Sequence, residues 1–161
     1  MNGRLICNMI AIIAAASFAG VMLFIGLMLG AYWQSLPPAA FLDWFSTNSH
    51  LIARTIPLVA MPALLGVVLS LRLDWQEPTR RRLWAGALAA LLGIAIITFA
   101  YHLPMNARFD ARAVPLDQVT DLLDQWLAWH ALRVALGLVA AALGVIAASS
   151  PAGRLAAPAV G

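Results

Sequence analysis

The stretch DQWLAWHALRVALGLVAAALGVIAA, residues 124–148, has the length and composition of a membrane-spanning helix. About 20 mostly apolar residues, rising about 1.5 Å each, cross the roughly 30 Å of hydrocarbon in a bilayer. The stretch nevertheless carries His130 and Arg133. A charged side chain at the centre of such a helix costs about 2.5–3.5 kcal/mol on insertion scales, so Arg133 is expected to face the protein interior.

Three further apolar runs of similar length lie at residues 5–33, 51–71 and 83–103. The chain is 63% hydrophobic and only 11% charged, which excludes an ordinary soluble domain. In lipid every backbone polar group must be satisfied within its own segment, so these runs should be helices. The sequence therefore predicts an all-α integral membrane four-helix bundle, one domain over residues 1–161, with its fourth helix at 119–148.

The first run could instead be a cleaved signal peptide. Arg4 precedes it, and the residues AAASFAG at 14–20 resemble a cleavage site. The apolar run continues to Trp33, however, well beyond the roughly 7–15 residues of a signal-peptide core. We therefore expect a retained helix.

The basic residues predict the orientation in the membrane rather than a nucleic-acid partner, although the net charge is +3. Two outer-loop arginines, Arg108 and Arg112, are balanced by Asp110 and Asp117. The positive-inside rule assigns the more basic segments to the cytoplasm, so both termini should lie there. Arginine without lysine, in an alanine-rich chain, suggests a bacterial protein of the cytoplasmic membrane. The arginines assigned to the cytoplasmic side are Arg4, Arg72, Arg80, Arg81, Arg82 and Arg154.

Small residues in the first run predict close helix packing. Gly26 and Gly30 form a G-x-x-x-G pair, and Gly20 precedes this pair in the same run. A neighbouring helix of the bundle is the expected partner, and a homo-oligomer is the alternative. Residues 39–47, with aromatic side chains on either side of Asp43, are expected to form a short interfacial helix.

Polar residues gather at the outer end of the predicted bundle. In the fourth helix Trp126, His130 and Arg133 are spaced i, i+4, i+7 and share one stripe, with Trp129 beside it. The other polar residues expected at that end, from the second and third helices, are His50, Arg54, His102 and Asn106. An intramembrane ionisable group normally faces the bundle interior or a wet cavity, so we expect a polar site here.

A purely structural interpretation remains open. Tryptophan is enriched at membrane interfaces, so Trp126 and Trp129 could be belt residues. Arg133 could pair with an aspartate of the outer loops only to satisfy its charge.

Two segments also carry a resemblance to a known family. LPMNARF at 103–109 followed by WLAWHALRVALG at 126–137 resembles the anthrone oxygenase family of small four-helix membrane proteins. That family shows a P-x-N turn after the third helix and a W-x3-H-x2-R pattern in the fourth. The matching positions are Pro104, Asn106, Trp126, His130 and Arg133. Chain length and the basic cytoplasmic loop agree, so the resemblance covers most of the chain, but His50 and His102 lie outside the pattern.

The resemblance implies oxidation of an anthrone to an anthraquinone by dioxygen. The methylene group of an anthrone is acidic because its carbanion is delocalised onto an aryl oxide, and this carbanion can reduce dioxygen without a metal. The reaction needs a general base, most often a histidine, and a fixed donor for the developing oxyanion.

On this hypothesis His130 removes the proton, while Arg133 and Asn106 hold the oxyanion. No cofactor is required, and the partners are the lipid bilayer, dioxygen and an apolar aromatic molecule. The residues expected to bind that molecule are Trp126, Trp129, His102, His50 and Arg54.

Two other function classes stay open. His102 and His130, alone or with His50 as a third ligand, could hold a metal or a haem between helices. The single cysteine, Cys7, excludes a cysteine-based cluster, and no E-x-x-H spacing of a di-iron site is present. Alternatively, the protein could be a non-catalytic membrane subunit whose polar cluster binds a partner or a lipid headgroup.

Overall fold

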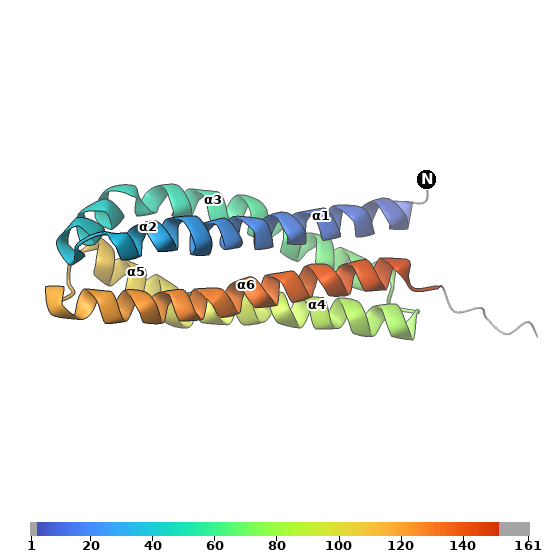
Figure 1. Ribbon diagram of the computed structural model, residues 1–161. Coiled ribbons are helices and arrows are strands. Elements are labelled where there is room, and N and C mark those ends of the chain that lie inside the picture. The colour runs from blue at the N-terminus through green and yellow to red at the C-terminus, as the bar shows by residue number, and fades with distance from the viewer. Residues whose placement is uncertain (1–2, 152–161) are drawn as a thin grey trace, which may run out of the picture.

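The computed structural model describes residues 3–151, and within them it contains helices and no strands (Figure 1). The first span consists of α1 (Gly3–Phe24), the π-helical turn η1 (Ile25–Leu29) and α2 (Gly30–Ser35). The second is the single helix α3 (Pro38–Leu73). The third joins α4 (Pro78–Ile97), the π-helical turn η2 (Thr98–His102) and α5 (Leu103–Asp110), and the fourth joins the 3-10 turn η3 (Leu116–Gln118) to α6 (Val119–Ser149).

All four spans are long and apolar enough to cross a membrane, which confirms the predicted fold class. They contain 33 to 36 residues each, so at about 1.5 Å per residue they measure about 50 Å. The hydrocarbon layer is only about 30 Å thick. The helices are therefore longer than the predicted apolar runs, because hydrophobicity marks the part of a helix that crosses lipid and not where the helix ends.

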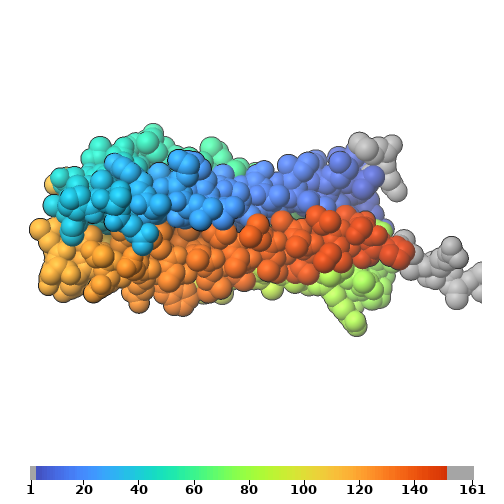
Figure 2. Space-filling view, in the orientation of Figure 1, coloured from blue at the N-terminus to red at the C-terminus, as the bar shows by residue number. Residues whose placement is uncertain are grey.

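The spans form a ring of neighbours. α1 packs against α3 and α6, and α4 packs against α6 and α3. Successive spans run antiparallel, so residues 3 and 151 lie at the same end of the bundle (Figure 1). Figure 2 shows α1, α2 and α6 lying against one another along the visible face.

The middle of the bundle presents apolar side chains outward. Leu58, Ile96 and Phe99 are 74%, 68% and 70% exposed, respectively. A soluble monomer rarely exposes contiguous apolar surface of this kind, whereas lipid covers it without cost. The exposed belt and the long apolar helices together indicate a multi-pass membrane protein.

Two segments predicted to lie outside the spans are helical extensions of them. Residues 39–47 form the first turns of α3 rather than a separate interfacial helix, because Phe41 and Phe45 are buried against Trp33 and Phe109. Residues 103–110, predicted as a turn and loop, form α5. Pro104 follows η2 directly within the continuous third span, so its missing N–H falls where the hydrogen-bond register changes.

Glycines allow close approach between spans at several positions. A Cβ on Gly66 of α3 would lie 2.8 Å from Cα of Ala11 in α1, so only glycine fits. Gly26 and Gly30 face α6, with their nearest neighbours in His130 and Leu127. The expectation that Gly20 also packs against another helix was wrong: it is exposed, and nothing lies within 4 Å of its Cβ position.

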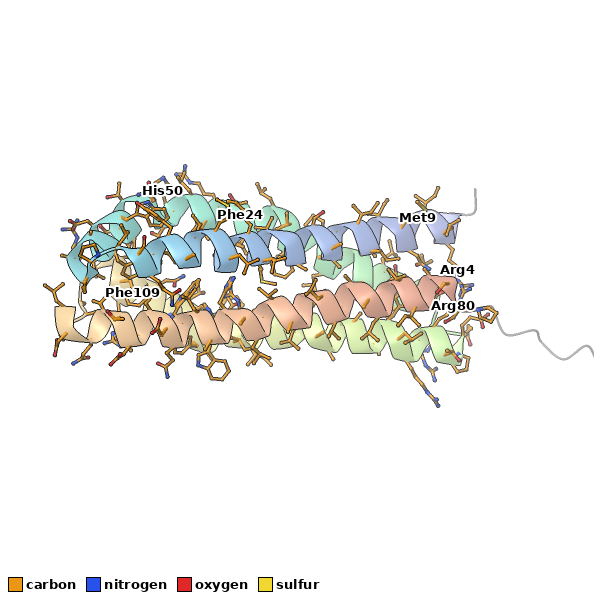
Figure 3. All side chains as sticks on the ribbon, in the orientation of Figure 1. Arg4, Met9, Phe24, His50, Arg80 and Phe109 are labelled. Carbon is orange, nitrogen blue, oxygen red and sulfur yellow. The ribbon has the colours of Figure 1, made fainter. Side chains whose placement is uncertain are left out.

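A buried carboxylate ties the spans together at the end where the described chain begins and ends. Asp74 is fully buried and accepts hydrogen bonds from Nε1 of Trp84 at 2.8 Å and Nδ2 of Asn8 at 3.3 Å. Arg4 forms an ion pair with it, and Nη1 of Arg80 lies 3.8 Å from its Oδ1. Figure 3 shows Arg4 and Arg80 at this end, away from His50 and Phe109.

Candidate functional site

Two π-helical turns lie beside the polar cluster near the other end of the bundle. η1 includes Gly26, whose Cβ position lies 3.1 Å from Cδ2 of His130. η2 contains Thr98 and His102, both of which belong to the cluster. Single π-helical turns inside α-helices occur frequently at functional sites. The first and third spans therefore both change their hydrogen-bond register where they meet the polar stripe of α6.

Arg133 lies inside the bundle, as expected from its depth in the span, and is 7% exposed. Its Nη1 donates to Oγ1 of Thr98 at 3.3 Å, and its Nη2 donates to Nδ1 of His130 at 3.0 Å. No aspartate or glutamate forms an ion pair with it among the described residues. Among the described residues, the guanidinium is thus held by neutral acceptors and has no carboxylate partner.

His130 is 1% exposed, and both its ring nitrogens are engaged. Arginine can only donate, so Nδ1 is the acceptor of the bond from Arg133. Nε2 lies 2.7 Å from the backbone oxygen of Met22 in α1, and a carbonyl can only accept. His130 is therefore neutral with its proton on Nε2, and it links α6 to α1.

Trp126 covers both imidazoles of the cluster. Its ring stacks on His130 with a centroid separation of 5.0 Å and an interplanar angle of 8°. It meets His102 edge to face, with centroids 4.7 Å apart. Nε1 of Trp126 donates to Oδ1 of Asn106 at 2.8 Å. Asn106, predicted to hold an oxyanion beside Arg133, thus accepts a hydrogen bond from the tryptophan ring in this structure.

Two buried nitrogen atoms in the cluster have no hydrogen-bond partner, namely Nε2 of His102 and Nε of Arg133. The backbone of Trp126 lies near the His102 ring but makes no hydrogen bond of good geometry with Nε2. Orphaned polar atoms are uncommon in protein interiors, because each one costs about 1–3 kcal/mol. A ligand with one donor and one acceptor group would satisfy both.

Three of the predicted substrate-binding residues do not join this cluster. His50 and Arg54 are exposed on α3 (Figure 3). The predicted second helix began at residue 51, whereas α3 begins at Pro38. The sequence pattern therefore did not show which face of the helix carries His50 and Arg54. Trp129 is 40% exposed and packs against Tyr101 with ring centroids 5.9 Å apart.

The predicted set of three histidines is not assembled as a metal site. His102 and His130 have ring centroids 6.1 Å apart, but His50 is on the exposed face of α3. Within residues 3–151 no group of three or more His, Cys, Asp or Glu side chains could hold a metal ion. The described part of the chain therefore does not form a metal site of three such side chains.

One cavity lies beside the cluster. Its volume is about 170 Å³, and Trp33, Phe41, Leu123 and the hydrogen-bonded pair Gln34–Asp124 contribute to its walls. Trp33 contacts Trp126 edge to face, with centroids 5.6 Å apart. Two tryptophan rings thus separate the cavity from the histidines.

Three contributors to the cluster were not predicted as site residues. Thr98 accepts from Arg133, the backbone of Met22 accepts from His130, and Gly26 makes room for the imidazole. Thr98 was detectable as a hydroxyl one helical turn before His102 within an apolar run. The carbonyl of Met22 has no signal in the sequence, because every residue carries one.

The comparison with known families agrees with this arrangement. The family model described as anthrone oxygenase matches residues 41–143, which is more than half of the chain and includes every side chain of the cluster in the third and fourth spans. No curated protein and no solved structure matches the chain. The chain belongs to the anthrone oxygenase family.

Proposed function

We propose that this protein oxidises an activated aromatic methylene, as in an anthrone or a related polyketide, to a carbonyl with dioxygen. The proposal is supported most by the uncompensated charge of Arg133, buried among neutral acceptors beside two histidines. Burying a guanidinium without a carboxylate costs free energy, which an anionic ligand would recover. Family membership supports the oxygenase class.

The reaction balances without a cofactor. Loss of one proton from the methylene gives a carbanion delocalised onto the ring carbonyl as an aryl oxide. Transfer of electrons from this anion reduces dioxygen, which bonds to the same carbon, and loss of one water leaves the second carbonyl. One dioxygen is consumed for each quinone and each water formed.

In this proposal Arg133 stabilises the aryl oxide. A preorganised donor in a site without water is worth far more than the same donor in solution, typically about 100- to 1,000-fold in rate. His130 fixes the direction of the guanidinium through Nδ1, and Asn106 controls the ring of Trp126. An apolar substrate partitions into lipid together with dioxygen and can enter from the membrane.

We also propose that the protein lies in a bacterial cytoplasmic membrane with both termini inside. The arginine-rich connection from Arg72 to Arg82 then faces the cytoplasm, as the positive-inside rule requires. In this orientation the cluster at His102 and His130 lies nearer the outer face.

The test uses purified protein in detergent or nanodiscs with 1,8-dihydroxyanthrone. Quinone formation and oxygen uptake are both measured above the spontaneous rate. For the wild type we expect equal amounts of quinone formed and oxygen consumed. We expect Arg133→Lys to lower the rate of quinone formation by about 100-fold or more, because lysine lacks the planar donor fork. Arg80→Lys at the opposite end is the control for membrane insertion. Equal rates for wild type and Arg133→Lys would contradict the proposal.

A further inference from the structure

His102 has the only imidazole in the cluster with a nitrogen left open. Its Nδ1 lies 3.5 Å from the backbone oxygen of Ile97, an atom that only accepts hydrogen bonds. We assign the proton to Nδ1 on the basis of this contact, which leaves a lone pair on Nε2. The backbone of Trp126 also lies near the ring. This Nε2 is buried and has no hydrogen-bond partner, in a side chain that is 1% exposed.

His130 differs in this respect. Its Nδ1 lone pair accepts from Arg133, and its Nε2 proton is donated to Met22. His130 could take a proton from a substrate only after one of these bonds broke. Its geometry suits a residue that positions Arg133.

Arg133 supplies the complementary open atom. Its Nε–H is buried and unpartnered. Its Nη1 bonds to Thr98, which lies one helical turn before His102 on the third span. The open acceptor of His102 and the open donor of Arg133 thus belong to one small region between the third span and α6.

We propose that Nε2 of His102 accepts the proton from the substrate methylene, while Nε of Arg133 donates to the oxygen that becomes negative. This inference rests on the proposed function and adds the identity of the base. The C–H bond breaks, an N–H bond forms on His102, and the electron pair moves onto the ring carbonyl as an aryl oxide. The step needs no oxidant and precedes the reaction with dioxygen.

Trp126 sets the condition for this step. Its ring covers the imidazoles of both His102 and His130. The ring must turn aside when substrate enters, and the one hydrogen bond from its Nε1 holds it to Asn106.

The experiment measures removal of the proton separately from the reaction with dioxygen. Under anaerobic conditions in deuterated buffer, the protein should catalyse exchange of the methylene protons of 1,8-dihydroxyanthrone, measured by mass spectrometry above the spontaneous rate. We expect His102→Gln to lower this exchange by about 100-fold or more, the usual contribution of a general base. His50→Gln, whose side chain is exposed on α3, should leave exchange unchanged. His130→Gln should lower exchange less than His102→Gln does, because the glutamine oxygen can still accept from Arg133. In His102→Ala, added imidazole should restore exchange.

Each result has a defined meaning. If His130→Gln loses exchange and His102→Gln keeps it, His130 is the base and the inference is overturned while the proposed function stands. The inference is also overturned if His102→Gln and His130→Gln both keep full exchange. It is likewise overturned if His50→Gln is the one variant that loses exchange. A wild-type protein that neither exchanges nor oxidises the substrate overturns both.

A measurement on the unaltered protein covers the case in which substitutions of His102 fail to fold. Nitrogen NMR of histidine-labelled wild-type protein reports which ring nitrogen carries the proton, and His130→Gln identifies the signal of His130. We expect the proton on Nδ1 of His102 and on Nε2 of His130. A proton on Nε2 of His102 would overturn the inference.

Discussion

Nδ1 of His130 lies 3.0 Å from Nη2 of Arg133, one turn further along α6, and this hydrogen bond joins the two side chains. Replacing either partner removes the same interaction. Residues that share a hydrogen bond show coupling energies of about 0.5–3 kcal/mol in double-mutant cycles.

We therefore expect non-additive effects of His130→Leu and Arg133→Lys on the oxidation of 1,8-dihydroxyanthrone. The double variant should be little slower than the slower single variant, because the second change removes a bond already lost. The values of kcat/KM for the four proteins check this. Fully multiplicative losses would mean that the two side chains act separately.

Gly26 provides the second prediction. A Cβ at this position would lie 3.1 Å from Cδ2 and 3.4 Å from Nε2 of His130, so a larger residue must displace the imidazole. Gly26→Leu should lower the free energy of unfolding by about 1–3 kcal/mol, as expected for overpacking, and should also weaken oxidation. Gly20→Leu is the matched control in the same span, because nothing lies within 4 Å of its Cβ position. Thermal unfolding in detergent measures the stability of both variants. Equal losses of stability in Gly26→Leu and Gly20→Leu would show that the contact with His130 is unimportant.

The sequence predicted the four spans because apolar length is set by the bilayer, and it predicted that Arg133 faces inward because lipid does not solvate a charge. It could not predict the π-helical turns, which arise from tertiary packing rather than from residue type. Without those turns, the orientation of His102 relative to α6 was not fixed. The hydrogen-bond partners of Asn106 and His130 also required coordinates, since spacing along a helix gives the face of a side chain but not its partner.

Topology is the third prediction. Residues 3 and 151 lie at the same end of the bundle, so the two termini should share one side of the membrane. The arginines of the α3–α4 connection lie at that end too, and the positive-inside rule assigns it to the cytoplasm. Arg154 contributes to this argument but lies outside the described residues. A reporter fused after Gly161 should read cytoplasmic, and one inserted at Ala113 should read external; the opposite pattern would invert the orientation.

The last prediction compares two aspartates in different surroundings. Asp74 is fully buried and is contacted by Arg4, Asn8, Trp84 and Arg80. Asp43 pairs with Arg112 at 3.0 Å, but both side chains are more than half exposed. Removing one partner of a buried ion pair costs about 3–5 kcal/mol because the remaining charge is uncompensated, whereas an exposed pair contributes about 0–1 kcal/mol.

Asp74→Ala should therefore lower the unfolding temperature markedly, while Asp43→Ala should leave it nearly unchanged. Because Asp74 joins the first, second and third spans at the end opposite His130, the stability loss should reach the polar cluster around His130 only through global unfolding. Below the unfolding temperature, Asp74→Ala should keep its oxidation rate per folded molecule. A loss of that rate without unfolding would reveal coupling between the two ends of the bundle.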